Sequence, residues 1–78
     1  MEKYVVGLGN LSNPLYMGVV VLNTVKNDTV YNSVLRKNDI LDFLADLKIP
    51  QKESLIKIST GNSLFVELKN LGYKIIEV

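Results

Sequence analysis

Two periods of hydrophobic residues run along this chain, one typical of strands and the other of helices. Stretches rich in β-branched and apolar residues predict five strands, at about 3–9, 16–25, 29–36, 54–59 and 73–78. Apolar residues at every third or fourth position predict two helices, at about 39–48 and 62–71. The predicted order is therefore β-β-β-α-β-α-β, in a single small α/β domain that spans residues 1–78.

The first predicted helix has one apolar face, with acidic side chains pointing away from it. That face consists of Ile40, Leu41, Leu44 and Leu47. We expect Asn38 or Asp39 to cap the first turn and Pro50 to end the segment.

Residues 54–78 hold the clearest pattern: a strand, a polar turn, a helix and a final strand. The apolar face of this helix is predicted to consist of Leu64, Phe65, Leu68 and Leu71. Asn62 or Ser63 can cap its first turn, and Gly72 can adopt the left-handed conformation that ends it. A strand-helix-strand unit of this kind normally joins two parallel strands.

The first three strands are joined by short turns, which predicts an antiparallel meander. Asn27 and Asp28 are the pair predicted to form a tight hairpin turn. Asn32 places a polar side chain on one face of the third strand, as suits the edge of a sheet. With the first strand at the centre, the mixed five-stranded sheet has the order 3-2-1-4-5. Two helices cannot cover both of its faces, and Lys57 in an apolar strand predicts a face that is partly open or covered by a partner subunit.

The glycines in Val6-Gly7-Leu8-Gly9-Asn10 look at first like a nucleotide-binding turn. A dinucleotide site of that kind needs a helix directly after the glycines, because the pyrophosphate rests on the helix N-terminus. Here Pro14 and a valine-rich strand follow instead. We therefore interpret both glycines as residues that let the chain bend out of the first strand.

Composition excludes several kinds of chemistry. The chain has no cysteine and no histidine, which removes disulfides, cysteine–histidine zinc sites, histidine bases and Ser-His-Asp triads. Asp39, Asp42 and Asp46 follow one helical face, and we interpret them as solvated partners of the helix dipole rather than as metal ligands. We expect no cofactor, no metal and no enzymatic activity.

The length of the chain and its apolar content predict how the protein assembles and where it is located. An apolar fraction of 47% is high for a chain of 78 residues, so we expect a homodimer. No apolar run approaches the roughly 20 residues that span a bilayer, and no secretion signal is evident at the N-terminus. We therefore expect a cytoplasmic protein with no membrane contact.

The segment most typical of a binding site is the turn before the second helix, which consists of Ser59, Thr60, Gly61, Asn62 and Ser63. It follows the carboxyl end of a parallel strand, where α/β sheets commonly bind ligands, and its N–H and hydroxyl groups can face an anion. The alternative is that these residues only cap the helix. Basic residues near the first helix and the fourth strand can extend such a site, or they are ordinary surface charges: Arg36, Lys37, Lys48, Lys52 and Lys57.

The order of elements resembles the ribonuclease H-like superfamily, whose core is three antiparallel strands, a helix, a strand, a helix and a strand. Residues 4–23 are similar to the opening hairpin of that superfamily, in which an aspartate follows the first apolar run. Gly9 stands about where that aspartate would be, and Ser59-Thr60 stands where a second acid would follow the fourth strand. The resemblance therefore implies the fold without the carboxylates that hold two Mg²⁺ ions for phosphodiester hydrolysis.

Residues 59–78 are also similar to the end of the ribosomal small-subunit protein eleven family, with a turn containing glycine and serine, a helix, a Gly-Tyr stop and a last strand. Those proteins bind ribosomal RNA and carry basic tails, which this chain lacks. The similarity implies a non-catalytic use of the fold in binding.

Three functions remain open at this stage. The first is a non-catalytic module that contacts nucleic acid or a nucleic-acid-handling protein, although a net charge of +1 argues mildly against nucleic acid. The second is a homo-oligomeric protein-interaction or regulatory module, which uses an exposed sheet face or the edge strand ending at Val78. A metal-dependent nuclease is a distant third.

Overall fold

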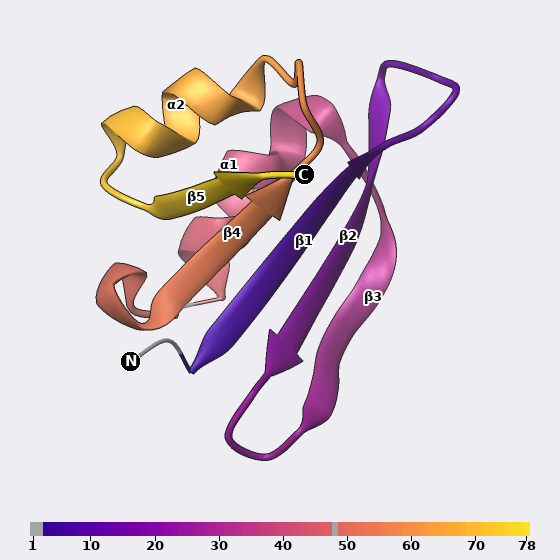
Figure 1. Ribbon diagram of the computed structural model, residues 1–78. Coiled ribbons are helices and arrows are strands. Elements are labelled where there is room, and N and C mark those ends of the chain that lie inside the picture. Colours follow the sequence, from indigo (N-terminus) through magenta and orange to yellow (C-terminus); the bar gives the residue numbers. More distant parts are fainter. Residues whose placement is uncertain (1–2, 48) are drawn as a thin grey trace.

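Five strands form one mixed sheet in the order β3-β2-β1-β4-β5 (Figure 1). The computed structural model describes residues 3–47 and 49–78. The strands are β1 (Tyr4–Asn10), β2 (Tyr16–Asn23), β3 (Asp28–Arg36), β4 (Ser54–Ile58) and β5 (Lys74–Glu77). The helices are α1 (Ile40–Asp46) and α2 (Leu64–Asn70), with short 3-10 turns η1 (Lys37–Asp39) and η2 (Gln51–Glu53).

The pairing of the strands confirms the predicted sheet. β1 lies at the centre, antiparallel to β2 and parallel to β4. β2 and β3 form an antiparallel hairpin, and β5 lies parallel to β4 at the opposite edge. β3 is therefore an edge strand, as Asn32 predicted.

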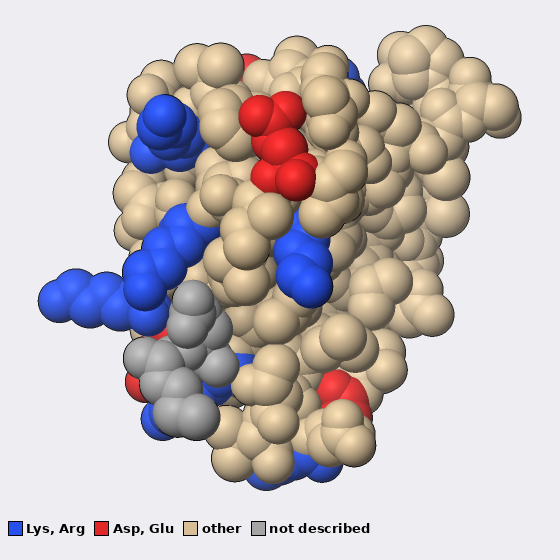
Figure 2. All heavy atoms as spheres, in the orientation of Figure 1, with Lys and Arg blue, Asp and Glu red and all other residues tan. Residues whose placement is uncertain are grey.

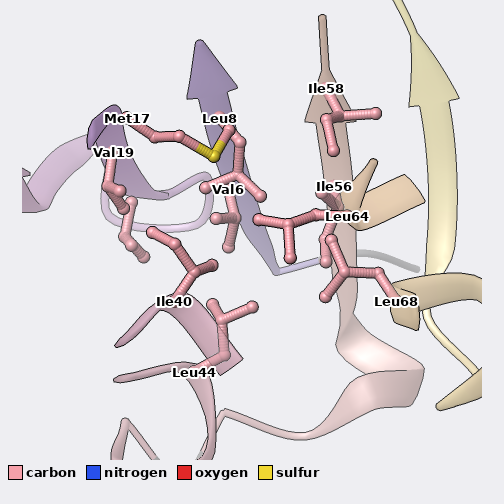
Figure 3. Packing of buried hydrophobic residues seen from close by; sticks show 11 residues of the cluster. Val6, Leu8, Met17, Val19, Ile40, Leu44, Ile56, Ile58, Leu64 and Leu68 are labelled. Atoms are coloured by element: carbon pink, nitrogen blue, oxygen red, sulfur yellow. The ribbon is translucent and has the colours of Figure 1, made fainter. Parts of the chain in front are cut away.

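Both helices pack on the same face of the sheet. Alternate residues of β1, β2 and β4 point toward the helices and are buried: Val6, Leu8, Met17, Val19, Val21, Ile56 and Ile58. Ile40 and Leu44 of α1 and Leu64 and Leu68 of α2 complete this core (Figure 3). A fully buried aliphatic side chain of this kind contributes about 1.5–3 kcal/mol to folding. Neither helix of the described residues lies on the opposite face of the sheet.

The first helix is shorter than the sequence predicted. Neither Asn38 nor Asp39 caps it through its side chain. The 3-10 turn η1 precedes the helix instead, and the N–H of Ile40 donates to the carbonyl of Lys37. Lys48, the predicted last residue, lies outside the described residues. No helix in the described ranges combines the length and apolarity needed to cross a membrane.

The second helix ends as predicted, in a left-handed glycine. Gly72 has a φ of 99°, its N–H donates to the Lys69 carbonyl, and the Tyr73 N–H donates to the Leu68 carbonyl. This pair of bonds is a Schellman motif. One prediction was wrong, because Leu71 is 52% exposed. It is the C-cap residue directly after α2, and the chain reverses at the next position before Leu71 can reach the sheet.

The hairpin between β2 and β3 is wider than predicted. Four residues, 24–27, separate the strands, in place of a tight Asn27-Asp28 turn. The side-chain oxygen of Asn23 accepts the N–H groups of Val25 and Lys26 at 3.0 and 3.1 Å, which curls the chain before it turns. Asn27 then takes the left-handed conformation, with a φ of 55°.

The two glycines of β1 do not bend the chain, contrary to the interpretation from sequence. Gly7 pairs with Val20 on one side and Lys57 on the other, and Gly9 pairs with Gly18. The strand continues through both to Asn10. Glycine is tolerated here because both positions lie on the face without helices, where no side chain is needed to fill a core.

Candidate functional site

The turn predicted as a binding segment lies where the sequence placed it, between the end of β4 and the start of α2. Most of its polar groups hold the turn together. Ser59 Oγ accepts the N–H of Asn10 at 3.3 Å, and the Ser59 N–H donates to the Leu8 carbonyl, which ties β4 to the end of β1. The N–H and hydroxyl of Thr60 both donate to the Val78 carbonyl, at 3.1 and 3.0 Å.

Asn62 is the central residue of this turn and is only 6% exposed. Its Oδ1 accepts the N–H of Leu64 at 2.9 Å, so Asn62 supplies the predicted cap. Its Nδ2 donates to Oδ1 of Asn10 at 2.8 Å and lies 3.5 Å from the sulfur of Met17. Ser63, the other predicted cap, is exposed and makes no capping bond with its side chain.

These contacts support the structural alternative for the turn. Of the groups expected to face an anion, the hydroxyls of Ser59 and Thr60 and the N–H of Asn62 bond to the chain itself. The helix that follows, α2, has only seven residues. Anion binding by Ser59–Ser63 stays a prediction, with Thr60, Gly61 and Ser63 as its exposed members.

Some of the predicted residues meet around a cavity of about 300 Å³ at the carboxyl ends of β1 and β4. Lys37 lines it from η1, and Gly61 and Asn62 line it from the turn. The remaining wall comes from the end of β1, the loop after it and the start of β2: Asn10, Leu11, Pro14, Tyr16 and Met17. The position is the one that parallel sheets commonly use for ligands.

The other predicted residues lie elsewhere. Arg36 lines a separate hollow of about 230 Å³ with Leu15, Tyr16 and Asn38. Lys57 points to the face of the sheet that carries no helix, where it lines a hollow together with Ser59. Lys37, Arg36 and Lys57 thus line three different hollows, and Lys48 lies outside the described residues.

The face without α1 and α2, which we call the open face, is the partly open face that Lys57 predicted, although its other residues were not identified from the sequence. In the view of Figure 1, α1 lies behind the sheet, so Figure 2 shows the open face from the same side. Strand pairing arranges its residues in three rows across the sheet. The rows are Val34-Gly18-Gly9, then Asn32-Val20-Gly7-Lys57-Ile76, then Thr29-Leu22-Val5-Leu55-Lys74.

The open face is largely apolar yet exposed. Val34 is 53% exposed and Ile76 is 46% exposed. In Figure 2 the part of this face over β2 and β3 is mostly free of charged side chains, whereas charges are visible at the centre of the view, toward β4 and β5, and at the hairpin end. The sequence signal for this face was the alternation of side chains along β2. Val19 and Val21 point into the core, so Val20 and Leu22 between and after them point to the open face.

The centre of the open face is a shallow trough with a glycine floor. Gly7, Gly9 and Gly18 lie side by side on β1 and β2, and a side chain built at Gly9 would meet nothing within 4 Å. The trough has a volume of about 340 Å³ and is walled by Val20 on one side and by Lys57 and Val78 on the other.

Lys57 is the charged residue of the middle row. Within the ranges that the structure describes, no carboxylate lies within 4.0 Å of its ammonium group, and the ion pair found joins Lys3 to Glu53. None of the residues in the three rows is acidic.

The residue types present define the available chemistry. Among the described residues, no three acidic side chains come together as a metal site would require. Gly9 lies on β1 and Ser59 follows β4 on the neighbouring strand, so neither position expected to hold an acid supplies one. No protein-family model, curated protein or solved structure matches this chain.

Proposed function

We propose that the protein is a non-catalytic binding module that engages a protein partner through the open face of its sheet. The observation that carries the proposal is the exposure of Val34, Ile76 and Val78 on a face that no helix covers. Apolar side chains that are exposed together on one face of a small domain are typical of interaction sites. The hydrogen bonds that Ser59, Thr60 and Asn62 make within the chain support binding elsewhere than at the turn.

We also propose that the fold is a degenerate member of the ribonuclease H-like superfamily. The strand order and the placement of α1 and α2 between β3, β4 and β5 support this assignment. Gly9 and Ser59 at the expected acid positions support a binding role rather than phosphodiester hydrolysis.

Site-specific photocrosslinking tests the proposed function. A benzophenone amino acid replaces Val34 on the open face, and a matched variant carries it at Val66, which is 60% exposed on α2. In an extract of the source organism, the Val34 probe is expected to form a discrete protein adduct that excess unlabelled protein displaces. Equal labelling from both positions, or none from Val34, would contradict the proposal.

Nucleic-acid binding is the second candidate, supported by the cavity that Lys37 shares with Gly61 and Asn62. Fluorescence polarisation with labelled single- and double-stranded DNA and RNA, at two salt concentrations, tests it. Phosphate contacts weaken steeply as salt rises, whereas apolar contacts do not. Binding that fades with salt and weakens in Lys37→Ala would favour this candidate, whereas sensitivity to Lys57→Ala alone would place the nucleic acid on the open face.

The homodimer expected from composition stays a prediction. Light scattering coupled to size-exclusion chromatography measures the mass of the free chain directly.

A further inference from the structure

We infer that the occupant of the open face is an amphipathic helix of a partner protein that carries a carboxylate opposite Lys57. This inference rests on the proposed function and adds the chemistry of the partner. Two features of the face carry it: the glycine trough and the lone charge at its wall.

The trough favours large apolar side chains. Gly7, Gly9 and Gly18 leave bare backbone between Val20 and Lys57, and the hollow of about 340 Å³ is open to solvent. A helix laid on a sheet presents apolar side chains at i, i+3 or i+4 and i+7, which can enter such a hollow in succession. On the opposite face, Ile40 and Leu44 of α1 and Leu64 and Leu68 of α2 already cover the sheet in this way.

The charge of Lys57 specifies the rest of the partner. Its ammonium group has no carboxylate within ion-pair distance in the described chain, and it lies between Gly7 and Ile76 in the middle row. A partner that covers the face removes water from this group, and burying an unpaired ammonium is strongly unfavourable. The occupant must therefore bring a negative charge to Lys57.

The same argument disfavours a second copy of this chain on the open face. The three rows of the face contain Lys57, Lys74 and no acidic residue, so a copy would bring two further lysines and no carboxylate from its own rows. Charge complementarity thus points to a different, acidic partner.

A displayed library of amphipathic helical peptides tests the inference. Each peptide has a fixed apolar face, with the positions flanking it randomised among Glu, Gln and Lys. Helices selected by the wild-type protein are expected to be enriched in Glu at one flanking position. Their affinity is expected to fall about tenfold or more in Lys57→Glu and to recover when that Glu becomes Lys. Lys52→Glu, at an exposed position in η2, is the matched control and is expected to change affinity little.

Gly9→Val fills the trough and is expected to abolish binding of the selected helices. Gly9→Ala adds a smaller side chain to the trough, and Lys57→Met removes the charge without reversing it. Circular dichroism checks that each variant is folded. Selected helices that show no preference for Glu, or that bind Lys57→Glu as tightly as the wild type, would overturn the inference. In that case the proposed function would still stand if the Val34 crosslink is sensitive to Gly9→Val. Absence of both helix binding and such a crosslink would overturn both. Labelled oligonucleotide or a second copy of the chain bound in a Gly9-dependent manner would also overturn the inference.

Discussion

Asn62 donates a hydrogen bond from Nδ2 to Oδ1 of Asn10, at 2.8 Å, across 52 positions of the chain. This bond joins the turn before α2 to the end of the central strand. The same buried amide caps α2 through the N–H of Leu64. One side chain therefore fixes the relative positions of β1, β4 and α2.

Asn62→Ala is expected to lower the free energy of unfolding by about 1–3 kcal/mol, because it removes a cap and leaves the buried N–H of Leu64 without its partner. Urea unfolding followed by circular dichroism measures the change. Asn70→Ala, at an exposed position in α2, is the control and is expected to shift the midpoint little. The double variant Asn10→Ala, Asn62→Ala should cost less than the sum of the single variants. Additive costs would show that the 2.8 Å bond contributes nothing.

Gly72→Ala tests the left-handed end of α2. The φ of 99° disfavours any side chain, and a Cβ would lie 3.2 Å from Oε1 of Gln51. We expect a loss of about 1–2 kcal/mol in the free energy of unfolding. Gly61→Ala is a matched variant, since it has a φ of 82° but open space around its Cβ, so it should lose the backbone term alone. A larger loss at Gly61 than at Gly72 would contradict this account.

Gly9→Ala is expected to act in the opposite direction. Gly9 has ordinary extended backbone, and an added Cβ meets nothing within 4 Å. Because glycine in a strand interior is less favourable than alanine by about 0.5–1 kcal/mol, the variant should unfold at a higher urea concentration than the wild type. Thermal and urea unfolding measure this, with Gly72→Ala as the contrasting variant. A clear loss of stability would mean that the trough is needed by the fold itself.

Sequence patterns predicted most of the fold because its elements have strong local signals. Leu64 and Leu68 recur one turn apart and are both buried, and Gly72 stands where the left-handed stop occurs. The order 3-2-1-4-5 followed from short connections between the first strands and from the helical connections after them. Leu71 was misplaced because periodicity does not say where a helix ends in space.

The candidate site was harder to predict because each of its residues is compatible with two structural interpretations when only the sequence is known. Gly7 and Gly9 read as a bend, since glycine marks turns, but here they form the bare floor of a sheet face. Asn62 was recognised as a possible cap, whereas its bond to Asn10 depends on pairing between distant strands. Lys57 indicated an open face because it is a charged residue in an otherwise apolar strand. The glycine trough beside Lys57 could not be predicted, because it depends on how β1 pairs with β2 and β4.

Lys57→Val tests the role of the single charge in the middle row of the open face. Lys57 is exposed and makes no ion pair in the described chain, so its loss should leave the free energy of unfolding unchanged within about 0.5 kcal/mol. Removing it joins the apolar residues on either side into one uncharged patch, and such patches promote association. We therefore expect Lys57→Val to have a higher mass than the wild type at equal concentration, as measured by light scattering. Combining Lys57→Val with Gly9→Val is expected to dissociate the associated form. Lys52→Val removes an exposed charge outside this face and should leave the mass unchanged. If Lys57→Val and Lys52→Val associate to the same degree, the charge at Lys57 has no special role in keeping the open face free.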